Sequence, residues 1–260
     1  MNNVLSARVI EQLARRQLAD YQATNPGTCF SDHNFNIGVS SAYALQDAIT
    51  RIRIESGEHV IGYKVGCTGP GTRTQFGMDG PIRGTLFAGE ALTNKANINP
   101  NEFCQLAIEG EMAISVGENY EIKAAFPVIE LHNFIFRSDK KTLSELIANN
   151  GINAGIVLPE KKWQKSKKYI KDSGLLTLRI NDSDIGNAGL WPNDDRPEVS
   201  LIWLKNNLLE YGIELVPGDI VLTGTALGLY PVKDGDEIVV YLDGEPAVIC
   251  SIKTPYTTSI

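Results

Sequence analysis

Two glutamates lie two residues apart within the apolar segment Ala107–Ile114. Side chains alternate across a β-strand, so Glu109 and Glu111 share one face of the predicted strand. Ile108 and Met112 share the other face and are expected in the core. Neighbouring carboxylates repel each other unless a positive group lies between them, and Mg²⁺, Mn²⁺ and Ca²⁺ prefer oxygen ligands. The pair fits either a divalent-cation site or the solvent-exposed face of an antiparallel strand.

A third carboxylate, Glu130, follows the apolar run Pro127–Ile129. It is either a further metal ligand or the surface end of a strand. His132 shares the face of Glu130 if this strand continues. That histidine is a candidate outer ligand or partner of a ligand, or it is simply packed and hydrogen-bonded.

Lys64 lies in the predicted strand Val60–Cys67 and has Gly62 and Gly66 on its own face. Glycine in a strand often marks close approach by a ligand or by another backbone. Lys64 is therefore either a ligand-facing ammonium or an edge-strand lysine that discourages aggregation. In the first case, partial burial is expected to lower its pKa and to let it move protons.

A buried strand is expected to run into the glycine-rich loop at 218–228, and functional groups often lie in such loops. Thr225 in this loop either contacts a substrate carboxylate or belongs to a plain turn. Gly-x-Ser-x-Gly is absent from the sequence. This absence argues against the nucleophile elbow of α/β-hydrolases.

The elements that must position these residues are predicted to be helices first and then mostly strands. Apolar residues recur at helical spacing near the start of the chain, and again from Ser40 or Ser41 to a stop near Gly57. Helices are also expected near Thr142–Asn149 and Glu198–Tyr211. Besides the strands around Lys64 and Glu109, the expected strands are Ala124–Glu130, Ala154–Leu158, Leu175–Ile180, Asp219–Thr223, Glu237–Leu242 and Ala247–Ile252. Such a pattern predicts an α+β fold, with an N-terminal helical segment at 1–58 and a β-rich core at 59–260.

Composition narrows the classes of partner. The chain has 260 residues, 43% of them hydrophobic, and a formal net charge of -7. The negative charge argues against broad binding to nucleic acid or to anionic membranes. No apolar run approaches the roughly 20 residues that span a bilayer. The four cysteines include no C-x-x-C pair, and the first residues do not resemble a signal peptide, so reduced thiols in the cytoplasm are expected.

Taken in order, these segments resemble the family of 2-oxopent-4-enoate hydratases and 4-oxalocrotonate decarboxylases, within the fumarylacetoacetate hydrolase superfamily. The resemblance runs from about residue 58 and rests on Gly62-Tyr63-Lys64-Val65-Gly66, Gly84-Thr85-Leu86-Phe87, Glu109-Gly110-Glu111, Leu146-Ile147-Ala148-Asn149-Asn150 and Gly218-Asp219-Ile220-Val221-Leu222-Thr223-Gly224-Thr225. It implies a twisted β-roll with an N-terminal helical part. It also implies homo-oligomers, as pentamers or decamers.

The resemblance further implies Mg²⁺ or Mn²⁺ held by Glu109, Glu111 and Glu130. Lys64 would bind the small 2-oxo acid substrate and transfer a proton. The sequence departs from the family pattern at three positions. Ile82 stands where an acidic residue is usual, and the nearby Asp79 is its candidate catalytic substitute; Ile152 replaces a usual serine, and Asn133 a usual acidic residue.

The leading expectation is hydration of a 2-hydroxy-2,4-dienoate, through a metal-bound enolate, to a 4-hydroxy-2-oxo acid. One alternative is decarboxylation of a 4-oxalocrotonate-like 2-oxo dioic acid, with Arg83 on the distal carboxylate. Another is hydrolysis of an acylpyruvate, with His132 or Asp79 as the base for water. The non-enzymatic alternative is a degenerate scaffold subunit that associates with a homologous partner subunit.

Overall fold

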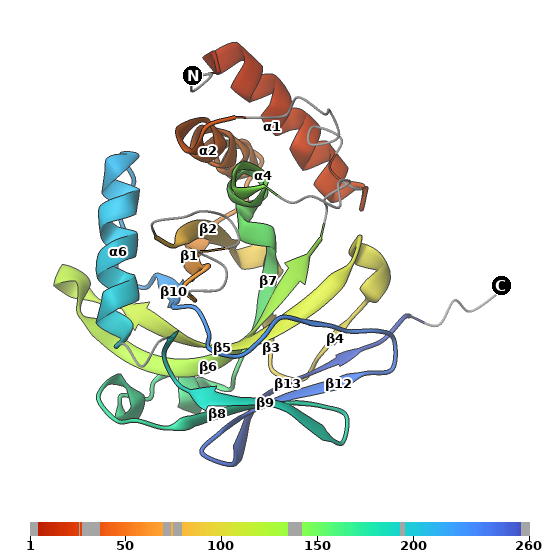
Figure 1. Cartoon of the computed structure of the whole chain (residues 1–260), viewed down its shortest axis with the longest axis vertical. Helices are drawn as coiled ribbons and strands as arrows, with labels where there is room; N and C mark the ends of the chain where they lie inside the picture. Colours follow the sequence, from red (N-terminus) through yellow and green to blue (C-terminus); the bar gives the residue numbers. More distant parts are fainter. Residues whose placement is uncertain are drawn as a thin grey trace.

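Two β-sheets pack against each other below a group of helices in the computed structural model (Figure 1). The structure describes residues 5–25, 27, 37–69, 74, 80–134, 142–192 and 196–255. The helices are α1 (Ala7–Gln22), α2 (Val39–Glu55), α4 (Leu143–Ala148), α5 (Lys161–Gln164) and α6 (Pro197–Glu210). Within these residues, no helix is both long and apolar enough to cross a bilayer.

The larger sheet has the strand order β2-β1-β10-β5-β6-β7-β3, and β11 pairs with β5 beyond the end of β10. Its strands are β1 (Val60–Gly66), β2 (Ile82–Phe87), β3 (Ala91–Thr93), β5 (Leu106–Val116), β6 (Ile122–Asn133), β7 (Asn153–Leu158), β10 (Ile220–Leu222) and β11 (Tyr230–Pro231). The smaller sheet has the order β4-β13-β12-β8-β9. Its strands are β4 (Ala96–Ile98), β8 (Leu175–Ile180), β9 (Ser183–Gly189), β12 (Glu237–Leu242) and β13 (Glu245–Ile252).

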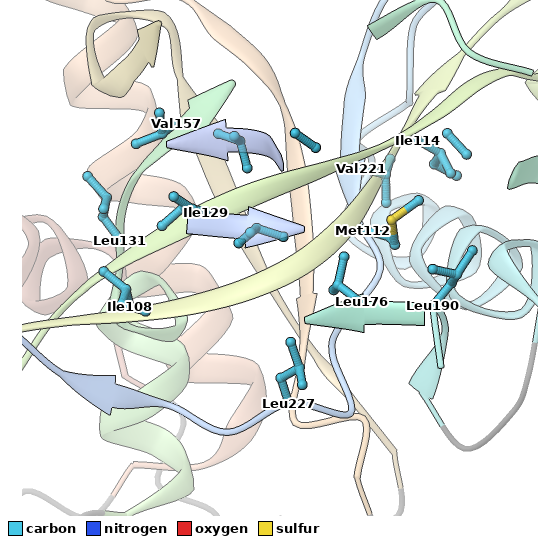
Figure 2. Close-up of a cluster of buried hydrophobic side chains, with 14 of the residues drawn as sticks. Ile108, Met112, Ile114, Ile129, Leu131, Val157, Leu176, Leu190, Val221 and Leu227 are labelled. Atoms are coloured by element: carbon cyan, nitrogen blue, oxygen red, sulfur yellow. The ribbon is translucent and has the colours of Figure 1, made fainter. Parts of the chain in front are cut away.

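The main hydrophobic core lies between the two sheets. Figure 2 shows Ile108, Met112 and Ile114 of β5 in this core, together with Ile129 of β6 and Leu176 of the smaller sheet. All five are at most 1% exposed. The strand period therefore placed the apolar face of β5 correctly, and the other face of β5 carries Glu109 and Glu111.

The opposite face of the larger sheet has a smaller apolar cluster around Phe126, Val128 and Leu222. By strand register, Lys64 lies beside Leu222, and Glu111 lies beside Val128. The side chains of directly paired residues point to the same face of a sheet. The lysine and the glutamates therefore share one face, which the curled sheet wraps around (Figure 1).

The free edge of β2 is covered by side chains rather than by another strand. The Tyr43 hydroxyl of α2 accepts from the backbone N–H of Arg83, and Gln46 Nε2 donates to the Arg83 carbonyl. Two residues on, the Asn150 amide bonds the backbone of Thr85. Unpaired edges otherwise invite association with other strands. These contacts also fix α2 against the sheet.

The N-terminal helices share a hydrophobic cluster with the β-rich part of the chain. Ala14 of α1 and Leu45 of α2 pack there with Ile82 of β2 and with Ile147 of α4. Helix α2 ends at Glu55, and β1 begins at Val60. The described residues 5–58 bury their apolar face against elements of the predicted 59–260 core.

Several strands were not predicted. Strands β3 and β4 have three residues each, too short for a period to register. Strand β2 contains a buried arginine and a glycine, and β9 reads Ser-Asp-Ile-Gly-Asn-Ala-Gly. Strand β9 is poor in the β-branched and aromatic residues that signal strands, and in β2 the arginine and the glycine interrupt them. Tertiary pairing, rather than local propensity, forms them.

Candidate active site

Glu109 of β5 and Glu130 of β6 are direct cross-strand partners. His132 lies two residues beyond Glu130 on the same strand and face. Its Nε2 atom is 3.2 Å from Glu109 Oε2 and 3.4 Å from Glu130 Oε2. Neither contact has hydrogen-bond geometry, and both ring nitrogens are buried without a partner among the described residues. His132 thus lies between the two carboxylates.

Lys64 reaches Glu130 from β1, a more distant strand of the same sheet. Its Nζ atom is 2.8 Å from Glu130 Oε1, and it also donates to the Gly151 carbonyl at 3.2 Å. Strands β10 and β5 lie between β1 and β6 in the sheet. In a flat sheet, β1 and β6 would therefore be ~14 Å apart. A lysine cannot bridge that span unless the sheet curls. The curl of the larger sheet is therefore what brings Lys64 to Glu130.

The alternatives that placed Lys64, Glu111 and Glu130 on the surface are wrong. Lys64, Glu111 and Glu130 are 4%, 2% and 1% exposed, respectively. Strand β1 lies between β2 and β10, so Lys64 is not on an edge strand. Glu109 is the one carboxylate of the set that reaches solvent, with its side chain 23% exposed.

Asn153 joins the cluster, although no sequence motif pointed to it. Its Nδ2 atom donates to Glu130 Oε1 at 2.7 Å, and its Oδ1 atom accepts from the Gly155 N–H. Glu130 Oε1 therefore receives both Asn153 and Lys64, and Oε2 is the oxygen that faces His132. A polar residue opening the apolar run of β7 is the signal that was available in the sequence.

Glu111 is buried beside the other two carboxylates. Its Oε1 atom has no hydrogen-bond partner among the described residues. Burial, together with the charges of Glu130 and Glu109, holds the pKa of Glu111 well above its usual range. An orphaned buried oxygen in a cluster of like charges is costly. The structure thus has a deficit of positive charge at this point.

The pKa values of the neighbouring groups follow from the same charges. Burial lowers the pKa of Lys64, but Glu130, Glu109 and Glu111 outweigh it, and the net shift is upward. The prediction of a lowered pKa for Lys64 is therefore wrong for this arrangement. Burial raises the pKa of Glu130, but His132 and Lys64 bring it well below its usual range. Burial lowers the pKa of His132, and Glu130 and Glu109 turn the net shift upward.

The residues present fit a hard divalent cation. Ligand atoms of Glu109, Glu130 and His132 all lie within 4.8 Å of one another. Glu111 adds the buried oxygen that has no partner. Against three glutamates, the described cluster holds Lys64 and His132, both with raised pKa values. Oxygen-rich, negatively charged sets of this kind are typical of Mg²⁺ and Mn²⁺ sites.

Glycines surround the aliphatic part of Lys64. A Cβ atom on Gly84, its partner in β2, would lie 2.9 Å from Lys64 Cγ and 2.6 Å from the Asn150 carbonyl oxygen. One on Gly66 would lie 3.1 Å from Lys64 Cε. Gly62 has a different purpose, since its Cβ would overlap the Ile220 backbone of β10 at 1.9 Å. Of the two glycines expected to flank Lys64, only Gly66 makes room for its side chain.

Arg83 does not join the cluster. Its Nη1 donates to Gln46, its Nη2 binds Asp47 at 2.8 Å, and its Nε donates to Asn207. The guanidinium is fully buried and lies 4.7 Å from the ring centroid of Tyr43. Arg83 neighbours Gly84 in β2, so it points to the opposite face from Lys64. The expected contact with a substrate carboxylate is therefore not supported, because α2 and α6 hold this side chain.

Thr225 lies over β5 between the two glutamates. Its hydroxyl donates to the Gly110 carbonyl at 2.8 Å and accepts from the Leu227 N–H. These bonds shape the loop between β10 and β11, and the turn alternative accounts for them. Asp79 lies outside the described residues. Asn133, in place of the usual acidic residue, accepts from the Cys104 N–H just before β5.

The two sheets and the N-terminal helices give the α+β fold predicted from the sequence. The fold closely matches 4-oxalocrotonate decarboxylase from Pseudomonas putida G7, complexed with magnesium and adipate. The TM-score is 0.88 at 19% identity, and the match covers 96% of this chain and 100% of that one. Fumarylpyruvate hydrolase from Pseudomonas aeruginosa, in complex with Mn²⁺ and pyruvate, matches with a TM-score of 0.55 at 14% identity. That match covers 76% of this chain and 90% of the other.

Similar sequences include proteins named as hydratases. The chain is 27% identical to the TodF product hydratase of Pseudomonas putida, over 89% of this chain and 92% of that protein. It is 26% identical to 2-keto-4-pentenoate hydratase 1 of Dechloromonas aromatica, over 93% and 95% of the two chains. No family model matches the sequence. The resemblance to the hydratase and decarboxylase family is confirmed by these homologues.

Proposed function

We propose that this chain is a metal-dependent hydratase that converts a 2-hydroxy-2,4-dienoate to a 4-hydroxy-2-oxo acid. The observation that carries the proposal is the buried contact between Lys64 and Glu130 inside a cluster of three glutamates. Similarity to proteins named hydratases along nearly the whole chain supports the same assignment.

Glu109, Glu111 and Glu130 would hold the divalent cation, Mg²⁺ or Mn²⁺. The oxygen without a partner on Glu111 and the Glu130 Oε2 atom that faces His132 support this assignment. When bound, the cation supplies Lewis acidity toward the carboxylate and 2-oxygen of a 2-oxo acid. Asn153 keeps Glu130 in place through Oε1.

Lys64 is the group we assign to proton transfer. The 2-hydroxyl loses its proton as C5 of the dienoate gains one, which leaves a 2-oxo acid with a double bond between C3 and C4. The Lys64 ammonium, 2.8 Å from Glu130 Oε1, is the group of the cluster that can donate this proton. General acid–base catalysis of this kind typically contributes about 10²–10⁴-fold.

Water then adds across the C3–C4 double bond, with its oxygen going to C4 and a proton to C3. Among the cluster residues, Glu109 is partly exposed, whereas Lys64, Glu111 and Glu130 are buried. We assign the entry of water to the Glu109 side of the cluster. His132 Nε2 lies 3.2 Å from Glu109 Oε2 on this side.

Decarboxylation of a 2-oxo dioic acid is the second candidate, because the fold matches a 4-oxalocrotonate decarboxylase closely. The same cluster would serve that reaction. Arg83 was the side chain expected to bind the distal carboxylate of such a substrate. It is held by Gln46 and Asp47 instead, which argues against decarboxylation. Assembly into a homo-oligomer, or with a homologous subunit, stays an expectation.

Calorimetry of Mg²⁺ and Mn²⁺ binding tests the site, with and without oxalate, on the wild type and on Glu111→Gln. Oxalate mimics the chelating end of a 2-oxo acid. We expect metal binding that tightens with oxalate and that Glu111→Gln weakens at least tenfold. Absence of metal binding by the wild type would favour the degenerate scaffold subunit instead.

Substrate profiling then separates the reactions. Purified protein with Mg²⁺ is given a 2-hydroxy-2,4-dienoate and, separately, an unsaturated 2-oxo dioic acid. Loss of the dienoate absorbance without release of CO₂ is the result expected of a hydratase. Release of CO₂ from the dioic acid alone would assign the decarboxylase.

A further inference from the structure

Three consecutive residues between α4 and β7 have left-handed backbone conformations. The φ angles of Asn150, Gly151 and Ile152 are 56°, 59° and 59°. Residues other than glycine visit this region mostly one at a time, at a cost of roughly 1–2 kcal/mol each. For a β-branched residue such as Ile152 the conformation is an outlier. A strained backbone persists only where its surroundings over-determine it, and such sites cluster at functional centres.

This left-handed turn, residues 150–152, faces the carboxylate cluster. Its central carbonyl, that of Gly151, accepts a hydrogen bond from Lys64 Nζ at 3.2 Å. The residue that follows the turn, Asn153, donates to Glu130 Oε1 at 2.7 Å. Lys64 also binds that oxygen, at 2.8 Å. One short segment thus provides partners both for the ammonium and for its carboxylate.

Side chains and backbone groups lock the turn in this shape. Asn150 Oδ1 accepts from the Thr85 N–H at 2.7 Å, and Asn150 Nδ2 donates to the Thr85 carbonyl at 2.9 Å. The Ile152 N–H donates to the Asn149 carbonyl at 2.8 Å. The Ile152 side chain is buried in the cluster shared by α2 and α4. These contacts offset the unfavourable φ angles.

We propose that the left-handed turn 150–152 is a positioning element for Lys64. The inference rests on the proposed function, in which Lys64 transfers the proton. A lysine has three N–H donors on a flexible stem, and Glu130 alone leaves its direction open. The Gly151 carbonyl adds a second, fixed acceptor, so the ammonium is held in one orientation. Asn150 and Gly151 are therefore positioning residues rather than catalytic ones.

The variants Asn150→Ala and Gly151→Ala test the turn. The first removes both hydrogen bonds to Thr85. The second puts a side chain on a left-handed position, in van der Waals contact with Lys64 Cε and Ile82 Cδ1, each 3.5 Å from the new Cβ. Gly212→Ala is the matched control, because Gly212 has φ of 72° and no atom within 4 Å of its Cβ position. It bears the same backbone cost at a site next to the end of α6.

The first readout is the acetylation rate of Lys64 by an amine-reactive ester, followed by peptide mass spectrometry. Wild-type Lys64 is 4% exposed and should react slowly. We expect Asn150→Ala and Gly151→Ala to react about tenfold faster, a factor that corresponds to about 1.4 kcal/mol. Gly212→Ala should keep the wild-type rate. Asn150→Asp, which retains the acceptor for Thr85, should fall between wild type and Asn150→Ala.

The second readout is the division of the loss between kcat and KM. A displaced ammonium should lower kcat about tenfold and leave KM and the affinity for Mg²⁺ unchanged. Equal labelling rates and equal kcat values in the turn variants and in Gly212→Ala would overturn the proposal. If wild-type protein turns over no dienoate, the proposed function fails, but the labelling rates still decide the role of the turn.

Discussion

Glu109 and Glu130 face each other directly across the β5–β6 pair, so two carboxylates stand in register on one face of the sheet. Like charges in this position destabilise an antiparallel pair. Positive charge offsets the repulsion here, because His132 lies within 3.4 Å of both carboxylates and Lys64 binds Glu130. The strand register thus creates a concentration of negative charge that a bound cation would neutralise.

The substitution Glu109→Gln should remove the response of stability to metal. A ligand at a hundred times its dissociation constant stabilises a protein by about 2.7 kcal/mol. For a chain of this size, each 1 kcal/mol corresponds to roughly 2–4 °C in Tm. We expect Mg²⁺ or Mn²⁺ to raise the Tm of the wild type by about 5–10 °C and that of Glu109→Gln hardly at all.

Without metal, the free energy of unfolding of Glu109→Gln should differ from that of the wild type by less than about 1 kcal/mol, because the substitution changes one cross-strand pair. Glu245→Gln, an exposed position at the start of β13, serves as the control and should keep the full shift in Tm. Retention of the metal-induced shift by Glu109→Gln would remove this residue from the ligand set.

The substitution Lys64→Met should separate metal binding from turnover. Methionine keeps most of the aliphatic stem but removes the charge 2.8 Å from Glu130 Oε1. The affinity for Mg²⁺ should therefore stay the same or increase in calorimetry. Turnover of the dienoate should fall at least 10²-fold, the lower end of general acid–base contributions.

Lys233→Met, at an exposed lysine, should change neither quantity. A different result would count against the proton-transfer role of Lys64. If Lys64→Met loses metal affinity and keeps its turnover number at saturating metal, the lysine is a structural partner of Glu130.

The common face of Glu109 and Glu111 was predictable, because it depends only on the two-residue period of a strand. The same period placed Ile108 and Met112 in the core between the sheets. The register that brings Glu130 opposite Glu109 was not predictable from local pattern. Register depends on how β5 pairs with β6. Only the family resemblance indicated that Glu130 joins Glu109 at one site.

The contact of Lys64 with Glu130 was beyond local reasoning, since it needs a sheet that curls across four strands. Arg83 was predicted to bind the substrate because the residue type indicates a positive charge but does not indicate where the side chain points. The neighbouring α2 directs that charge away from the cluster. Gly151 was missed for a similar reason, because a backbone carbonyl carries no signature in the sequence.

The substitution Arg83→Met should affect stability rather than specificity. Arg83 is fully buried and binds Asp47, Gln46 and Asn207. Removal of one partner of a buried pair typically costs about 3–5 kcal/mol, and the partial exposure of Asp47 places this pair near the lower value. Urea unfolding should show that loss, and the ratio of activities on mono- and dicarboxylic substrates should stay unchanged.

Arg15→Met is the matched control, because the Arg15 side chain is 62% exposed and, among the described residues, pairs with Glu11 one turn away in α1. It should change the free energy of unfolding by less than about 0.5 kcal/mol. If Arg83→Met folds and loses activity on dicarboxylic substrates alone, Arg83 binds the substrate after all.

The substitution Gly84→Ala should disturb Lys64 and the turn 150–152 together. Its Cβ would lie 2.6 Å from the Asn150 carbonyl oxygen, a backbone atom that cannot move aside cheaply, and 2.9 Å from Lys64 Cγ. Overpacking of this kind typically costs about 1–3 kcal/mol. We expect that loss in urea unfolding and a turnover number about tenfold lower. Gly89→Ala, with no atom within 4 Å of its Cβ position, should show neither effect. Equal behaviour of the two variants would mean that the turn does not pack against β2.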